Sequence, residues 1–122
     1  RPTGHAIECR INAEDPARGF APSPGTLSEL QWPGGPGVRV DTHAFRGYCV
    51  PPHYDSLLAK LVAWGRDRPE ALARMQRALA ELQIEGVTTT APFLARLLAS
   101  PTFQAGEVHT RYVEAFIEDL PC

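Results

Sequence analysis

The sequence has little of what marks several classes of protein. Its 12 Lys and Arg residues do not outnumber its 14 Asp and Glu residues, so no basic surface for nucleic acid or for a membrane is indicated. No apolar run reaches the roughly 18 residues that a membrane span needs. The longest candidate, residues 57–64, is interrupted by Lys60. We therefore expect neither nucleic acid nor a membrane among the partners.

Cysteine is also scarce. Three cysteines are an odd number that cannot form a closed set of disulfides, and Cys9 lies in an apolar stripe. Reduced thiols are the simplest interpretation, which favours a cytoplasmic protein. The sequence begins almost inside a predicted strand, without the apolar segment of a secretory signal, so we expect a piece of a larger polypeptide.

Proline and glycine are not abundant enough for a disordered chain. The 12 prolines and 10 glycines together stay below the roughly 25–30% that is typical of low-complexity sequences. Most of them lie in residues 1–52, which predicts a turn-rich first part followed by helices. A length of 122 residues is enough for one domain with a core.

The clearest stretch is residues 5–16, which alternates as a β-strand does until Pro16, which has no N–H to give to a ladder. One face carries three apolar residues, which are Ile7, Cys9 and Ile11. The other face carries three polar residues, which are Glu8, Arg10 and Asn12. An acid, a guanidinium and an amide in a row are typical of a strand that lines a polar cleft, so these three residues are functional candidates.

Further strands are predicted along the first half of the chain. Residues 26–32 and 38–43 alternate on either side of a Pro/Gly turn and predict an antiparallel meander, with a loop or short strand at 47–52. Residues 56–64 form an apolar run that predicts a buried strand. The turn at 33–37 lacks the lysine and the following helix of a phosphate-binding loop, so we interpret it as a plain turn.

Helical spacing dominates the rest of the chain. Asp67 is the predicted N-cap of a helix that ends at Gly86, and Thr90 caps a second helix that Pro101 ends. Thr110 caps a third predicted helix. The apolar side of that helix consists of Tyr112, Val113, Phe116 and Ile117. The predicted fold class is α+β, with a small antiparallel β-sheet from the N-terminal half packed against C-terminal α-helices.

Two spacings have the form of zinc half-sites, His5-x3-Cys9 and Cys49-x3-His53. Cys9 belongs to the apolar face and no C-x2-C pair occurs, so no metal site is predicted. The cysteines also lack a charged setting that would activate a thiol, so no cysteine nucleophile is predicted.

Several motifs resemble, in the right order, the C-terminal domain of biotin carboxylase. They are residues 4–16 (GHAIECRINAEDP), 22–25 (PSPG), 33–35 (PGG), 37–39 (GVR), 50–52 (VPP), 54–57 (YDSL) and 73–75 (ARM), with the region of Gly86. The resemblance implies that residues 1–122 are one such domain, from the ATP-dependent component of acetyl-CoA, propionyl-CoA, methylcrotonyl-CoA or pyruvate carboxylases. The family's ATP-grasp features are absent, so we expect the isolated piece to be inactive.

The resemblance implies a catalytic role for Arg10. In the family, ATP and bicarbonate form carboxyphosphate, and CO2 passes to the ureido nitrogen of biotin. Negative charge then builds on the ureido oxygen, and a guanidinium stabilises it because it stays protonated at any working pH. Glu8 and Asn12 are candidates to orient Arg10, and Asp55 is a candidate substrate-site acid. Glu8 and Asn12 are equally interpretable as strand-edge polar residues, Asp55 as a turn residue, and Arg10 as an arginine that pairs with Glu8.

The same resemblance implies the partners. ATP and Mg²⁺ bind in the ATP-grasp region of the same enzyme, outside this sequence, and biotin arrives as a substrate on biotin carboxyl carrier protein. The carboxyltransferase component is a further partner. Arg39 matches an arginine of the family's homodimer interface, whereas Pro36 and His53 stand where family members carry aromatic residues. Two alternatives stay open: a non-catalytic module that only packs against the ATP-grasp region and the dimer partner, and a free-standing relative with another ligand.

Overall fold

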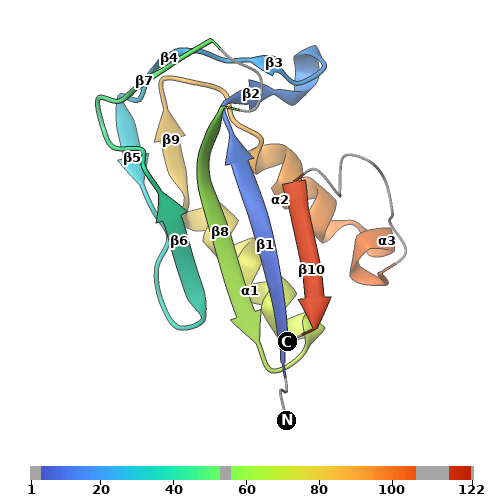
Figure 1. Cartoon of the computed structure of the whole chain (residues 1–122). Coiled ribbons are helices and arrows are strands. Elements are labelled where there is room, and N and C mark those ends of the chain that lie inside the picture. Colours follow the sequence, from blue (N-terminus) through green and yellow to red (C-terminus); the bar gives the residue numbers. More distant parts are fainter. Residues whose placement is uncertain (1–3, 53–55, 107–115, 122) are drawn as a thin grey trace.

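A four-stranded antiparallel sheet forms the centre of the fold (Figure 1). The computed structural model describes residues 4–52, 56–106 and 116–121, the last three of these through their backbone only. The strands lie in the order β10 (Ile117–Pro121), β1 (His5–Asn12), β8 (Leu57–Gly65) and β6 (Val38–Thr42). The sheet therefore joins the two ends of the chain, because β1 pairs with β10 on one side and with β8 on the other.

Helices cover one face of this sheet. They are α1 (Arg68–Glu81), α2 (Ala91–Ala99) and the short α3 (Pro101–Gln104), which lie behind the sheet in Figure 1. The core between the sheet and the helices contains Ile7, Cys9, Ile11, Ala59, Leu61 and Ala63 from the strands and Leu72, Met75, Leu79, Leu94 and Leu98 from the helices. The predicted apolar face of the first strand is confirmed, since its three apolar residues are completely buried.

Three two-stranded pairs surround the end of the main sheet. They are β2 (Glu14–Asp15) with β3 (Ala21–Pro22), β4 (Gly25–Thr26) with β7 (Cys49–Val50), and β5 (Glu29–Gln31) with β9 (Gln83–Glu85). The 3-10 helix η1 (Pro16–Arg18) follows β2, so pairing ends at Pro16 as predicted. A second, smaller core lies under these pairs and consists of Ala13, Leu27, Ala44, Val50 and Leu58.

The α+β fold class is confirmed, and so are the strand at 56–64 and the short strand within 47–52. The predicted antiparallel meander of residues 26–32 and 38–43 is wrong. Residues 26–32 divide into β4 and β5, which pair with β7 and β9, whereas β6 pairs with β8. Alternation predicts that a segment is a strand, but the partner is chosen by which surfaces are buried together.

Two predicted helix ends also differ from the structure. Gly86 does not end a helix, because α1 stops at Glu81 and residues 83–85 form β9. Pairing of β9 with β5 replaces the last helical turn. Pro101 does follow α2, but it also begins α3, where it lies in the first turn. Proline is tolerated at that position because its missing N–H has no partner there.

The third predicted helix falls largely outside the described residues, which do not include Thr110, Tyr112 or Val113. Its predicted end is wrong, because Ile117 begins the strand β10. Ile117 lies opposite Cys9 and is 5% exposed, so burial against β1 favours the strand.

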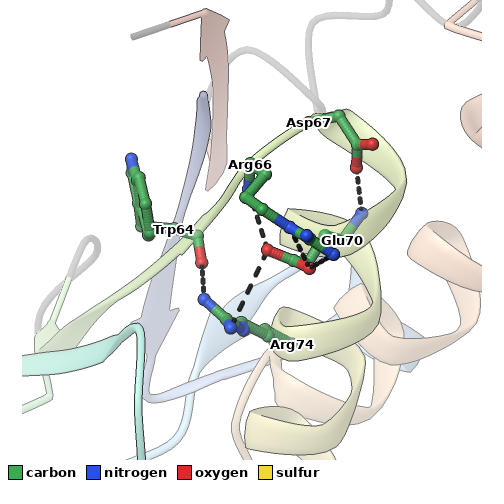
Figure 2. Close-up of polar contacts among 5 residues, drawn as sticks. All are labelled: Trp64, Arg66, Asp67, Glu70 and Arg74. Carbon is green, nitrogen blue, oxygen red and sulfur yellow. Dashed lines mark hydrogen bonds and ion pairs between the residues drawn. The ribbon is translucent and has the colours of Figure 1, made fainter. Parts of the chain in front are cut away.

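The junction between β8 and α1 is fixed by a polar cluster (Figure 2). Asp67 caps α1 as predicted, because its carboxylate accepts a hydrogen bond from the Glu70 N–H at 2.9 Å. The Glu70 carboxylate accepts from the Arg66 N–H at 2.8 Å, and Arg74 donates to the Trp64 carbonyl at 2.6 Å. The hydrogen bond from the Arg66 backbone, followed by that from its side chain, holds the pKa of Glu70 below the usual value of a glutamate.

Within the described residues, no helix has the length and apolar character needed to cross a membrane.

Candidate functional site

The candidate site is the sheet face that points away from the helices, which we call the open face (Figure 1). By alternation and register it carries Glu8, Arg10, Arg39, Asp41, Lys60, Val62 and Trp64. A fully solvated sheet face needs polar residues only for solubility. This face additionally groups several charged side chains near its centre, so it is a candidate binding or catalytic surface.

Arg10 lies directly opposite Lys60 of β8, and Asp41 of β6 lies on the far side of Lys60. Arg10 is exposed, and its guanidinium makes no hydrogen bond or ion pair with any residue that the structure describes. Two cations placed directly opposite each other on neighbouring strands destabilise a sheet. An exposed, unpaired guanidinium beside a lysine is suited to bind negative charge.

Glu8 precedes Arg10 on the open face and lies between Glu118 of β10 and Val62 of β8. It is half-buried, and no ion pair joins it to Arg10 in the part of the chain that the structure describes. The interpretation of Arg10 as a structural arginine paired with Glu8 therefore has no contact to support it.

Asn12 lies apart from the other two candidates on β1. The strand has an irregularity between Ile11 and Asn12, and Asn12 is only 5% exposed. Its amide nitrogen donates to the buried carboxylate of Glu14 at 3.4 Å, while its Oδ1 has no hydrogen-bond partner among the described residues. The extra residue of this irregularity is Leu58 of β8, so β1 itself keeps its alternation, and it is the burial of Asn12 that ends the exposed polar row at Arg10.

Arg39 lies on the edge strand β6 at the level of Glu8, with Val62 between them. It forms an exposed ion pair with Asp41 at 3.3 Å. Pro36 is exposed in the turn before β6. His53 and Asp55 lie outside the described residues, so their placement relative to Arg10 stays open.

Two residues near Arg10 were not singled out from the sequence. Lys60 was noted only as an interruption of an apolar run, although a lone cation within a buried strand is itself a pointer to an open face. Thr90 was assigned as a helix cap, but its hydroxyl contacts the backbone of β1. No sequence pattern reports a contact across 80 residues.

The described residues contain no group of three or more His, Cys, Asp and Glu residues that could bind a metal ion. Of the two cysteines that the structure describes, Cys9 is buried and Cys49 is exposed. The groups of the open face that can bind a substrate are therefore its charged side chains.

A comparison with known families and proteins identifies the chain. Residues 8–115 match the sequence profile of the biotin carboxylase C-terminal domain. The chain belongs to this family. The resemblance predicted from the motifs of the sequence is thereby confirmed.

Relatives and solved structures agree with this assignment. The chain is 53% identical to biotin carboxylase 1 of Bacillus subtilis over 93% of its own length and 25% of that protein. It is also 53% identical to the biotin carboxylase of a Nostoc species, covering 91% of this chain and 25% of that protein. The chain thus spans about a quarter of the length of these relatives.

Among solved structures, the fold is similar to the biotin carboxylase domain dimer of Hydrogenobacter thermophilus 2-oxoglutarate carboxylase, determined with MgADP and bicarbonate. The TM-score is 0.87 and the identity is 47%, over 93% of this chain and 25% of that chain. The biotin carboxylase C-terminal domain described here therefore shares both sequence and fold with enzymes of this name.

Proposed function

We propose that this biotin carboxylase C-terminal domain is part of a longer enzyme that uses ATP and bicarbonate to carboxylate biotin on biotin carboxyl carrier protein. Two observations support it: the family assignment, and the similarity to a biotin carboxylase domain whose structure contains MgADP and bicarbonate. ATP and Mg²⁺ bind, on this proposal, in an ATP-grasp region outside residues 1–122. A carboxyltransferase component then uses the carboxylated carrier.

The observation that carries the proposal is the exposed guanidinium of Arg10 on the open face, which has no hydrogen bond or ion pair among the described residues. Biotin, when bound, supplies the ureido nitrogen that accepts CO2 after losing its proton, and the ureido oxygen then gains negative charge. Arg10 donates hydrogen bonds to that oxygen, and its planar guanidinium suits the task better than a lysine. Lys60 adds positive potential beside it.

The other candidates take supporting roles in the same proposal. Glu8 shares a face of β1 with Arg10 and, without a direct ion pair, acts on the guanidinium through its nearby negative charge. Asn12, which is buried at the end of β1, supports the strand through its hydrogen bond to Glu14, and Asp55 is the proposed substrate-site acid. Arg39, on the exposed edge strand, contributes to a homodimer surface, as supported by the dimeric relative from Hydrogenobacter thermophilus. The exposed thiol of Cys49 is compatible with a cytoplasmic enzyme.

The test uses the full-length polypeptide that carries this domain. Purified enzyme is incubated with ATP, Mg²⁺, labelled bicarbonate and free biotin, and carboxybiotin is measured. We expect carboxybiotin that depends on each component, with one ADP released per carboxylation. Full-length enzyme that binds ATP but forms no carboxybiotin would contradict the proposed function.

A second candidate function is a packing and dimerisation module without catalytic residues. The exposed Trp64 on the open face, 44% accessible, favours it because large apolar side chains at a surface often mark contact sites. Replacement of Arg10 distinguishes the two functions. A module needs Arg10 only for contacts, so replacing it would alter assembly, whereas a catalytic Arg10 affects carboxylation with assembly intact.

A further inference from the structure

We propose that Thr90 is a positioning residue for Arg10, acting through the backbone of β1. This inference rests on the proposed function, because it concerns the same arginine. The observation is a set of three hydrogen bonds that join the start of α2 to the end of β1, at the residues on either side of the strand irregularity.

The strand β10 stops short of Arg10. Within the described residues it pairs with β1 from His5 to Cys9, so the backbone groups that follow Cys9 on that side bond to other partners there. Thr90 supplies them. Its hydroxyl accepts from the Asn12 N–H at 3.0 Å and donates to the Arg10 carbonyl at 3.3 Å. Its own N–H donates to the Asn12 carbonyl at 3.0 Å.

The environment makes these bonds important. Thr90 is completely buried and Asn12 is 5% exposed, so water cannot readily replace a lost partner. A buried polar group left without a hydrogen-bond partner destabilises the local structure. The strand is therefore expected to shift if the hydroxyl is removed, and the shift occurs at the residue that carries the guanidinium.

Thr90 differs in this respect from an ordinary helix cap. It lies at the N-cap of α2 with helical backbone angles, φ −76° and ψ −7°, and its side chain makes no capping hydrogen bond. The neighbouring Thr89 takes that role, since its hydroxyl accepts from the Ala91 N–H at 3.2 Å. The hydroxyl of Thr90 is thus free to bond β1, and Thr89 provides a matched control.

A bulge next to a functional residue is a known way to aim a side chain. Here the register of β1 with β8 shifts between Ile11 and Asn12, and Thr90 bonds the other edge of β1 at Arg10 and Asn12, so the position of Arg10 depends on α2 as well as on the sheet. A misplacement of about 1 Å in an active site can cost about 10²-fold in rate.

The experiment compares Thr90→Val, which keeps the shape and removes the hydroxyl, with Thr90→Ser, which keeps the hydroxyl. Both are made in the full-length enzyme, with Thr89→Val as the control. We expect Thr90→Val to lower kcat for biotin carboxylation about 10-fold to 10²-fold. Bicarbonate-dependent ATP cleavage stays within about threefold, because the groups that bind ATP are not moved. Thr90→Ser recovers most of the rate, and Thr89→Val keeps it.

The combination with Arg10→Ala makes the test specific to positioning. If Thr90 acts through Arg10, Thr90→Val has no further effect on carboxylation once Arg10 is alanine. Equal losses in both backgrounds, or an unchanged kcat for Thr90→Val, would overturn the inference. If Thr90→Val does not fold, Thr90→Ala takes its place in the same double-mutant cycle with Arg10→Ala. A wild-type enzyme without carboxylation would instead reject the proposed function.

Discussion

At the residue scale, the direction of Arg10 could be predicted from the sequence, and the position of Asn12 could not. Strict alternation places the side chain of Arg10 on the other face of the strand from the buried Cys9, and the structure agrees. The same alternation places Asn12 beside Arg10 at the surface, but Asn12 is buried where the register of β1 with β8 shifts, and its amide donates to Glu14. A bulge depends on partners distant in sequence, which a local pattern does not contain.

Gly86 provides a residue-scale prediction. Its φ is +108°, and a Cβ there would collide with the backbone of Thr26. Gly47 has a similar φ of +95° but open space around it. We expect Gly47→Ala to cost about 1–3 kcal/mol from backbone strain alone. Gly86→Ala should cost at least about 1 kcal/mol more because of the collision.

Urea denaturation of the two variants measures this difference. Equal losses of stability for Gly86→Ala and Gly47→Ala would mean that the approach of Gly86 to Thr26 does not constrain the fold.

At the element scale, periodicity predicted β1, α1 and α2, whereas β8 was predicted from a continuous apolar run that ends at Gly65. It did not predict their partners. β5 and β9 are only three residues each and pair with one another across more than 50 residues, and no local pattern specifies that pairing. Short strands gain most of their stability from tertiary contacts, so their sequences carry little information of their own.

The junction of β8 and α1 predicts a pH effect. Hydrogen bonds from Arg66 lower the pKa of Glu70 below the usual 4.5. A lowered pKa in the folded state stabilises the fold above the unfolded pKa, and this contribution is lost as pH falls through the folded value. Glu70→Gln should therefore be less stable than wild type near neutral pH, with a difference that shrinks in acid.

Unfolding curves between about pH 7 and pH 3 measure this effect, with Glu81→Gln on the same helix as the control for net charge. If the difference in the free energy of unfolding between wild type and Glu70→Gln stays constant over this range, ionisation of Glu70 does not stabilise the fold.

At the scale of the whole molecule, the motif resemblance predicted the family, while the strand order came only from the structure. The sequence placed the sheet in the N-terminal half, yet β10 from the C-terminal end forms one edge of it. The open face, with Arg10 near its centre and Arg39 on β6 at the opposite edge, is a property of that strand order.

The proposed dimer surface is tested at this scale. Arg39→Glu should raise the dissociation constant of the full-length dimer about 10-fold or more, because the reversed charge faces an unchanged surface of the partner subunit. Arg77→Glu is the matched control, since Arg77 lies on α1 and, like Arg39, forms an exposed ion pair within the chain. Sedimentation velocity measures both. A dimer that tolerates Arg39→Glu as well as Arg77→Glu would place the interface elsewhere.

The most direct test of the central claim is the ratio of biotin carboxylated to ATP cleaved in Arg10→Ala. The full-length enzyme is assayed for carboxybiotin and for bicarbonate-dependent ADP release in the same reaction, with Arg18→Ala as an exposed-arginine control. We predict that carboxybiotin falls about 10²–10³-fold while ADP release stays within about threefold, because Arg10 stabilises charge only on biotin. An unchanged ratio, with carboxylation at the wild-type rate, would contradict a catalytic Arg10 and leave this domain as a scaffold.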